Sequence, residues 1–181
     1  MIETATTSTR VACDILIEAG WVIPVRPAGM VLEQHAVVLN KDRIVAILRI
    51  TQASALYAPK QHIQRPNAVL MPGLVNAHCH NPMSLMRGVA DDLALMPWLN
   101  EHIWPIERAV MAPDFVEAGI ELAVAEMIRG GTTCCNENYF FPDVQAATYK
   151  RHGFRARVGL PVIDFPTAWA RSDDEYFDRA G

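Results

Sequence analysis

Short apolar segments alternate with turn residues in the first part of the chain. The segments are rich in β-branched residues and are separated by glycine, proline and polar turns; they occupy positions 15–17, 21–23, 36–39 and 44–48. Segments of this length between turn-forming residues are typical of β-strands. The pattern therefore predicts a small β-sheet module at the N-terminal end.

A continuous apolar run marks a second kind of strand. Residues 68–71 are apolar, Pro72 and Gly73 interrupt the run, and residues 74–77 continue it. Short continuous apolar runs favour strands that are buried on both faces, as in parallel sheets. We interpret this segment as a strand that enters a second domain, and the sequence therefore predicts domains at residues 1–68 and 69–181.

Helical and strand patterns alternate in the remainder of the chain. The clearest helix has apolar residues at helical spacing between Pro113 and Gly130, which suit its first and last turns. Strands are predicted at 132–136 and 155–160, with a short helix at 143–152 between them. This alternation predicts an α/β fold with a parallel sheet, either open and doubly wound or closed as a barrel.

The last residues of the sequence predict a helix that has only begun. Asp173, Asp174 and Glu175 favour a helix N-terminus because their charges complement the helix dipole, and the sequence ends soon after them. We therefore expect the chain to be the N-terminal part of a longer protein.

Composition and charge narrow the class of protein. Hydrophobic residues make up 51% and charged residues 20%, which fits a globular protein and excludes a disordered tail. The 16 Lys and Arg against 20 Asp and Glu give a net charge of -4 without a basic run, which argues against nucleic acid and anionic membranes as partners. The sequence shows no secretory signal, no run of the roughly 18–20 apolar residues that a membrane helix needs, and no disulfide pattern. We therefore expect a cytoplasmic protein with a small-molecule partner.

The pattern His78-Cys79-His80 follows the continuous apolar run. Residues two apart in a strand project to the same side, so both imidazoles can face one point while Cys79 faces away. Zinc accepts imidazole nitrogen, and two ligands on a rigid strand lose little entropy on binding. An isolated His-x-His pair is more often two surface or packing histidines. Its place at the expected C-terminal edge of a parallel sheet, where such folds carry their chemistry, favours the metal site.

The residues around this pair resemble a known family. The segment MPGLVNAHCH (71–80) is similar to the first barrel strand of the amidohydrolase superfamily. The segments NPMSLMRGVADD (81–92), PWL (97–99) and IWPIE (103–107) resemble its adenosine-type deaminases. The strongest resemblance is to the 5'-methylthioadenosine and S-adenosylhomocysteine deaminases, near the triazine chlorohydrolases and guanine deaminases.

This resemblance implies the architecture of the whole protein. It implies a metal-dependent (β/α)8 TIM barrel preceded by a small β-sandwich module that the C-terminal segment completes. A TIM barrel takes about 250 residues, so residues 69–181 would hold only its first three βα units, with strands at 74–77, 132–136 and 155–160. The remaining metal ligands, and the catalytic Glu, would then lie beyond Gly181.

The resemblance also implies the reaction. His78 and His80 would hold one divalent metal ion, zinc or alternatively iron, which activates water for attack on C6 of a purine nucleoside with release of ammonia. The enzyme would be a hydrolase acting on a C–N bond of a cyclic amidine. This chain alone is expected to be inactive because it lacks the later ligands and the catalytic Glu, and the resemblance leaves open whether the full-length protein forms a homo-oligomer.

Glu107 is the candidate substrate-binding residue. It matches the position at which nucleoside deaminases of this family hold the ribose hydroxyls, and a carboxylate suits two vicinal O–H donors. The competing interpretation is a solvated helix charge paired with Arg108 or Arg87. The Pro-Ile-Glu context and the offset from His80 favour the ribose contact.

Other residues near these motifs admit two interpretations. Trp98 and Trp104 could wall the purine pocket, although aromatic residues at helical spacing are more often core residues. Asn136 and Glu137, at the end of a predicted strand, could face the site or the interior. We interpret His102 as an ordinary helix histidine.

Leu160 is the candidate residue for contact with the 5' substituent of the nucleoside. Deaminases of this family that accept S-adenosylhomocysteine can use an Arg on the third strand to bind its carboxylate, and Leu160 aligns with that Arg. Arg171 aligns loosely with a second such Arg. Because Leu160 suits a methylthio group, we expect 5'-methylthioadenosine or adenosine to be preferred to S-adenosylhomocysteine.

Two alternative functions stay open at this point. The first is a triazine chlorohydrolase or aminohydrolase, or a guanine deaminase-like hydrolase, against which the ribose contact of Glu107 argues. The second is a non-catalytic, amidohydrolase-like scaffold. A scaffold has no physical need for two convergent imidazoles, so His78 and His80 argue against it.

Overall fold

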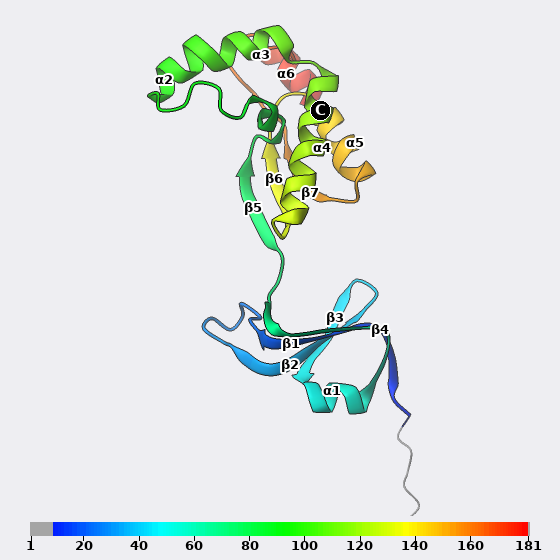
Figure 1. The fold of residues 1–181 in the computed structure, drawn as a ribbon. Helices are drawn as coiled ribbons and strands as arrows, with labels where there is room; N and C mark the ends of the chain where they lie inside the picture. Colours follow the sequence, from blue (N-terminus) through cyan, green and yellow to red (C-terminus); the bar gives the residue numbers. More distant parts are fainter. Residues whose placement is uncertain (1–8, 181) are drawn as a thin grey trace, which may run out of the picture. The chain divides into compact units, whose positions relative to one another are not determined.

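The computed structural model describes residues 9–180. The chain divides after Pro72 into two compact units, Met1–Pro72 and Gly73–Gly181 (Figure 1). Within residues 9–180, no helix combines the length and the apolar character that crossing a membrane requires. The two units are described separately below.

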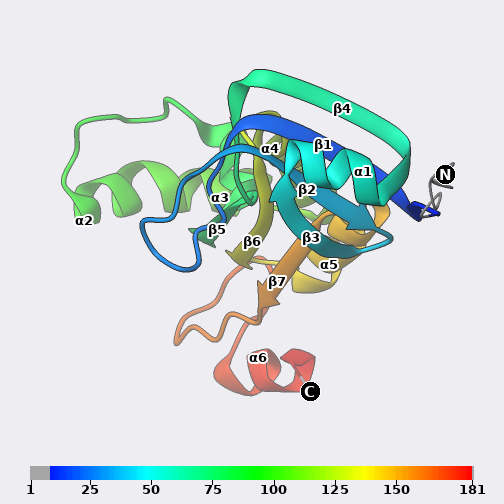
Figure 2. The same cartoon turned by 90° about the horizontal axis from the view of Figure 1, so that it is seen from below.

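The first unit is built on a four-stranded sheet. Its strands are β1 (Val11–Val22), β2 (Leu32–Asn40), β3 (Arg43–Arg49) and β4 (Tyr57–Leu70), in the order β3-β2-β1-β4. The pairs β1/β2 and β2/β3 are antiparallel, whereas β4 runs parallel to β1. The short helix α1 (Ile50–Leu56) connects β3 to β4 and packs on the sheet, where Ala53 is buried (Figure 2).

The strands predicted in this unit are present, but two of their limits differ. Gly20 does not end a strand, because β1 continues through it; a Cβ at Gly20 would lie 2.2 Å from the carbonyl oxygen of Pro66, so glycine permits the close approach of β4. The apolar residues Val69 and Leu70 pair with β1 and therefore finish the first sheet instead of opening the second unit. Their apolar character reflects this pairing and packing, since Leu70 contacts the cluster around Val22.

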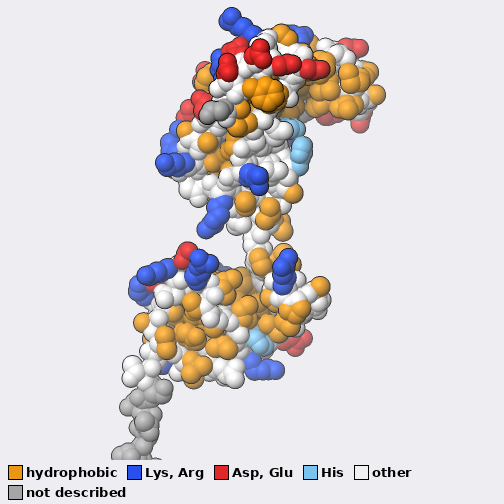
Figure 3. Space-filling model, turned by 180° about the vertical axis from the view of Figure 1, so that it is seen from behind, with side chains coloured by type: hydrophobic (Ala, Val, Ile, Leu, Met, Phe, Trp, Pro, Cys, Tyr) orange, Lys and Arg blue, Asp and Glu red, His pale blue; other side chains and the backbone are white. Residues whose placement is uncertain are grey.

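The residues described for this unit form one sheet and do not include the second sheet of a sandwich. Several large apolar side chains of the sheet stay exposed, among them Trp21, Ile44, Val45 and Val69. Figure 3 shows hydrophobic side chains gathered on the surface of this unit.

The second unit contains a parallel sheet in the order β5-β6-β7. Its strands are β5 (Leu74–Cys79), β6 (Thr132–Asn138) and β7 (Arg155–Gly159). The predicted alternation is confirmed, because α4 (Pro113–Arg129) connects β5 to β6 and α5 (Pro142–Arg151) connects β6 to β7. The second unit is thus a mixed α/β structure with helical crossovers between neighbouring parallel strands.

A longer excursion separates β5 from α4. It begins with the 3-10 helix η1 (Asn81–Met86). After a loop, three helical segments follow one another without a break: α2 (Leu95–Pro97), the π-helical η2 (Trp98–Ile103) and α3 (Trp104–Val110). The final helix, α6 (Asp173–Ala180), begins at the predicted acidic residues. The excursion places α3 near the carboxyl ends of the strands, as the cavity described below shows.

The core of the second unit lies between the sheet and α4 with α5. Val116, Ile120 and Val124 of α4 pack with Cys135 of β6 and Tyr149 of α5. Helix α4 also approaches η1 closely: a Cβ at Gly119 would lie 2.6 Å from the backbone of Pro82. The segment that follows His80 is therefore fixed against the longest helix of this unit.

Candidate active site

The carboxyl ends of the three parallel strands lie at the same edge of the sheet. This edge carries His78 of β5 and His80 just after it, Asn138 of β6 and Tyr139 just after it, and Leu160 after β7. Open and closed α/β folds alike place their chemistry at this edge, because the loops there are free to vary while the strands hold them in place.

His78 and His80 lie side by side. Their ring centroids are 4.9 Å apart with the rings nearly perpendicular, and both side chains are exposed. Cys79 between them is buried and directs its sulfur toward the carbonyl oxygen of Asn136, at 3.4 Å. The strand alternation therefore brings both imidazoles to one face and turns the thiol to the interior, as the sequence predicted.

The orientation of His80 is set by a backbone group. Its Nδ1 is hydrogen-bonded to the carbonyl oxygen of Asn138. A carbonyl only accepts, so Nδ1 carries the proton and the lone pair of Nε2 is left for another partner. Metal-binding histidines are commonly held in this way, which makes His80 chemically suited to be a ligand.

The described part of the chain supplies only part of a metal site. Within residues 9–180, no group of three or more His, Cys, Asp and Glu side chains is placed so that it could hold a metal ion. Two imidazoles fill half of a tetrahedral zinc shell. The pair fits a metal that receives its other ligands from elsewhere.

Glu137 belongs to the interior and not to the site surface. It is fully buried, and its carboxylate accepts hydrogen bonds from the amides of Asn81 and Asn138, at 2.9 and 3.0 Å, and from the Tyr149 hydroxyl, at 2.8 Å. Burial raises the pKa of this carboxyl, against the opposing effect of these donors. The neighbouring Asn136 is exposed and donates to the carbonyl oxygen of Ala77, at 3.1 Å.

A cavity of about 590 Å³ opens beside His80. Its wall comes from the excursion before α4, from the end of β6 and from the segment after β7; it includes Trp98, Trp104, Glu107, Arg108, Met111, Tyr139, Leu160 and Phe165. Trp98 and Trp104 thus line the cavity and are not fully buried, whereas His102 is absent from the cavity wall. The volume lies within the range of small-molecule sites, about 300–1,000 Å³.

Glu107 faces this cavity and is held by Tyr139. The Tyr139 hydroxyl donates to Glu107 Oε1 at 2.5 Å. Partial burial raises the pKa of the Glu107 carboxyl. Burial of Tyr139, together with its hydrogen bond to the Glu107 carboxylate, raises the pKa of the Tyr139 hydroxyl. The competing interpretation of a paired surface charge does not hold for Arg87, which forms its ion pair with Glu126 at 2.6 Å.

Tyr139 was not singled out by the sequence. It lies three residues after the predicted strand 132–136 and directly after the observed β6, so its place near the carboxyl end of a parallel strand was a usable signal. Its contact with Glu107 joins residues 32 positions apart, which no local pattern reveals.

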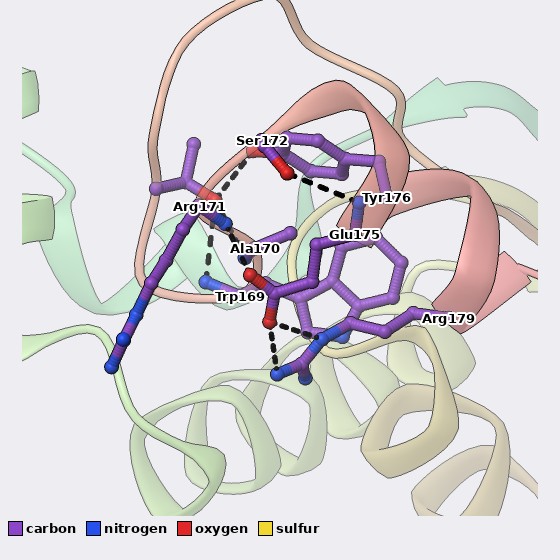
Figure 4. A network of polar contacts seen from close by, with 8 residues as sticks. Trp169, Ala170, Arg171, Ser172, Glu175, Tyr176 and Arg179 are labelled. Atoms are coloured by element: carbon purple, nitrogen blue, oxygen red, sulfur yellow. Dashed lines mark hydrogen bonds and ion pairs between the residues drawn. The ribbon is translucent and has the colours of Figure 1, made fainter.

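Arg171 does not line this cavity. Its backbone amide donates to Glu175 Oε2 at 2.8 Å, and Glu175 Oε1 pairs with Arg179 at 2.7 Å, as Figure 4 shows. Arg179 in turn lies 5.9 Å from the ring centroid of Trp169. These contacts tie the start of α6 to the preceding loop. Leu160 and Arg108, in contrast to Arg171, line the cavity.

Comparison with known proteins decides the family. Residues 69–179 match the model of the Amidohydrolase family. The chain belongs to the amidohydrolase family. The match covers the second unit, with both imidazoles and the cavity wall.

Two curated relatives of this amidohydrolase share one name. A 5-methylthioadenosine/S-adenosylhomocysteine deaminase from Saccharophagus degradans is 40% identical over 172 residues, which are 95% of this chain and 39% of the relative. The corresponding protein from Teredinibacter turnerae is 42% identical over 166 residues, 92% of this chain and 38% of the relative. The chain therefore spans about two fifths of the length of these relatives.

Solved structures agree on the fold. An adenosine deaminase from Xanthomonas campestris with bound zinc is 64% identical, with a TM-score of 0.93 over 96% of this chain and 39% of that one. The atrazine chlorohydrolase from Arthrobacter aurescens TC1, a zinc complex, is 17% identical with a TM-score of 0.77, over 91% of this chain and 41% of that one. At that identity the second likeness shows the fold alone.

Proposed function

We propose that the full-length protein that carries this sequence is a metal-dependent hydrolytic deaminase of an adenosine-type nucleoside, which releases ammonia from C6 of the purine. The observation that carries the proposal is that His80, of the imidazole pair, and Glu107 line one cavity of suitable size. The names of the relatives from Saccharophagus degradans and Xanthomonas campestris support the nucleoside substrate.

His78 and His80 would hold the metal. The geometry supports this role, because the imidazoles are adjacent and the Nδ1 of His80 is already bound to a carbonyl. A divalent metal such as zinc lowers the pKa of bound water toward neutrality and so makes it available as a nucleophile. The zinc in the Xanthomonas campestris structure supports zinc as the ion, with iron as the alternative. The other ligands and the catalytic Glu would come from outside residues 9–180, so this chain alone would be inactive.

Glu107 would hold the sugar. Its carboxylate lies on the cavity wall and can accept from the two vicinal hydroxyls of a ribose. Trp98 and Trp104 would then pack against the purine, since both line the same cavity from the excursion before α4.

Leu160 would receive the 5' end of the nucleoside. It lines the cavity with half of its surface exposed, and an apolar side chain there favours a methylthio group over a charged amino acid. We therefore propose 5'-methylthioadenosine or adenosine as better substrates than S-adenosylhomocysteine.

The fold proposal follows from the same family. The strands β5, β6 and β7 would be the first three of a (β/α)8 TIM barrel, which matches their parallel pairing in sequence order. The sheet of the first unit would be one layer of a β-sandwich, which accounts for its exposed apolar side chains such as Ile44 and Val69.

The test is a substrate comparison on the purified, zinc-loaded, full-length protein. Adenosine, 5'-methylthioadenosine and S-adenosylhomocysteine are offered separately, and ammonia release and the ultraviolet change from adenine to hypoxanthine are followed. Guanine and a chlorotriazine serve as comparison substrates. Turnover of guanine or the triazine without turnover of any adenosine would replace this proposal by the corresponding alternative, and no turnover at all would favour a scaffold.

A further inference from the structure

Tyr139 connects the two halves of the candidate site. Its hydroxyl donates to Glu107 Oε1 at 2.5 Å, and its ring centroid lies 5.9 Å from that of His80. Both Tyr139 and Glu107 line the cavity, yet Tyr139 follows β6 and Glu107 belongs to α3, which is distant in sequence. The contact therefore sets the position of the α3 carboxylate relative to the strand edge.

The phenol ring is itself firmly placed. Tyr139 is 7% exposed, belongs to the buried core of the second unit and lies 4.9 Å, between ring centroids, from Phe140. The residue before it, Asn138, provides the carbonyl that is bonded to His80. The hydroxyl thus reaches the cavity from a core residue that directly follows β6.

Glu107 depends on this hydroxyl for its orientation. Among residues 9–180, the only side-chain hydrogen bond to its carboxylate comes from Tyr139, and no cation there forms an ion pair with it. A free glutamate side chain samples several rotamers, and holding it in one of them costs conformational entropy. A partner that is already fixed reduces the part of that cost that falls on substrate binding.

The bond to Tyr139 leaves the carboxylate able to bind a diol. An ionised carboxylate has about four acceptor positions on its two oxygens, and Tyr139 occupies one of them on Oε1. Both oxygens can still accept from neighbouring hydroxyls. The geometry thus combines a fixed carboxylate with free acceptor positions.

We propose that Tyr139 is a positioning residue that makes the site selective for nucleosides with an intact vicinal diol, by holding the Glu107 carboxylate toward the sugar. The inference rests on the proposed deaminase function, within which it assigns a role to the residue that directly follows β6. Tyr139 acts through Glu107 and takes no part in the chemical step.

The experiment compares Tyr139→Phe with the unchanged full-length, zinc-loaded protein. The values of kcat and KM are measured for adenosine and for 2'-deoxyadenosine. Removal of the hydroxyl is expected to lower the ratio of the two kcat/KM values about tenfold, chiefly by raising KM for adenosine, with little change in kcat. In a Glu107→Gln background the same change should leave the ratio unaltered, because its effect runs through the carboxylate.

Tyr149→Phe is the matched control. It also removes a buried phenol that donates to a carboxylate, Glu137 at 2.8 Å, but neither residue lines the cavity. This control is expected to keep the discrimination of the unchanged protein even if it lowers stability. Melting temperature and zinc content, measured on every variant, separate a folding defect from a specific effect.

The outcomes distinguish the two proposals. If the unchanged protein deaminates no adenosine nucleoside, the proposed function fails and the role of Tyr139 fails with it. If it deaminates adenosine in preference to 2'-deoxyadenosine and a folded Tyr139→Phe protein does so to the same degree, only the inference about Tyr139 is overturned. An equal loss of discrimination in the Glu107→Gln background would overturn it as well.

Discussion

The backbone amide of Asn81 donates a 2.9 Å hydrogen bond to the buried carboxylate of Glu137. The other oxygen of that carboxylate accepts from the amide of Asn138, at 3.0 Å, whose own carbonyl is bonded to His80. One buried side chain therefore ties the residue after His80 to the residue that orients its imidazole.

Replacement of Glu137 should loosen this edge. Glu137→Ala leaves the amides of Asn81 and Asn138 and the Tyr149 hydroxyl without this acceptor. The cost is about 1–3 kcal/mol for each of the two buried donors, the Asn81 amide and the Tyr149 hydroxyl. We expect a loss of about 3 kcal/mol or more in the free energy of unfolding, together with weaker metal retention, measured by urea unfolding and elemental analysis of the full-length protein. Glu121→Ala, at an exposed carboxylate on α4, is the control. Equal stability of the two variants would show that Glu137 does not hold this edge.

The imidazole pair predicts the metal dependence. His78→Ala or His80→Ala removes one of the two candidate ligands, so we expect the full-length protein to lose its metal and its turnover together. His102→Ala, which changes a histidine of η2 that does not belong to the imidazole pair, should keep both. Elemental analysis and ammonia release provide the measurements. Turnover by a metal-free His80→Ala protein would contradict the assignment.

Leu160 predicts the order of substrates. The unchanged protein should show a higher kcat/KM for 5'-methylthioadenosine than for S-adenosylhomocysteine. Leu160→Arg places a guanidinium on the cavity wall, where it can bind a carboxylate bidentately, and should raise the relative kcat/KM for S-adenosylhomocysteine about tenfold, equivalent to about 1.4 kcal/mol.

Arg108 provides the check on that prediction, because it lines the same cavity. If the unchanged protein already prefers S-adenosylhomocysteine and Arg108→Met abolishes the preference, the carboxylate is bound by Arg108 and the argument from Leu160 is wrong.

Replacement of Gly119 by alanine should lower stability, although helix propensity alone would raise it. In the interior of a helix, alanine is normally more stable than glycine by about 1 kcal/mol. At Gly119, however, a Cβ would lie 2.6 Å from the backbone of Pro82, so α4 and η1 must move apart. We expect Gly119→Ala to lower the free energy of unfolding by about 1–3 kcal/mol, as overpacking does. Thermal unfolding provides the measurement, with the exposed Ala118→Gly as the control for propensity alone.

The sequence determined the elements whose pattern is local. The apolar spacing between Pro113 and Arg129 and its flanking residues defined α4, and the alternation of strands and helices defined a parallel α/β unit. Strand alternation also determined that His78 and His80 share a face while Cys79 points inward. These features depend on backbone geometry over a few residues, so they can be predicted without knowledge of the fold.

Tertiary structure decided what depends on distant partners. The polar strand β4 shows no apolar alternation and forms because it pairs with β1. The same pairing makes Val69 and Leu70 part of the first sheet. Whether Glu137 faced the site or the interior was settled by donors from η1 and α5. The bond between Tyr139 and Glu107 likewise depends on how the fold brings α3 to the residue that follows β6. Such contacts form only when the chain has folded, because no local periodicity encodes which distant groups will meet.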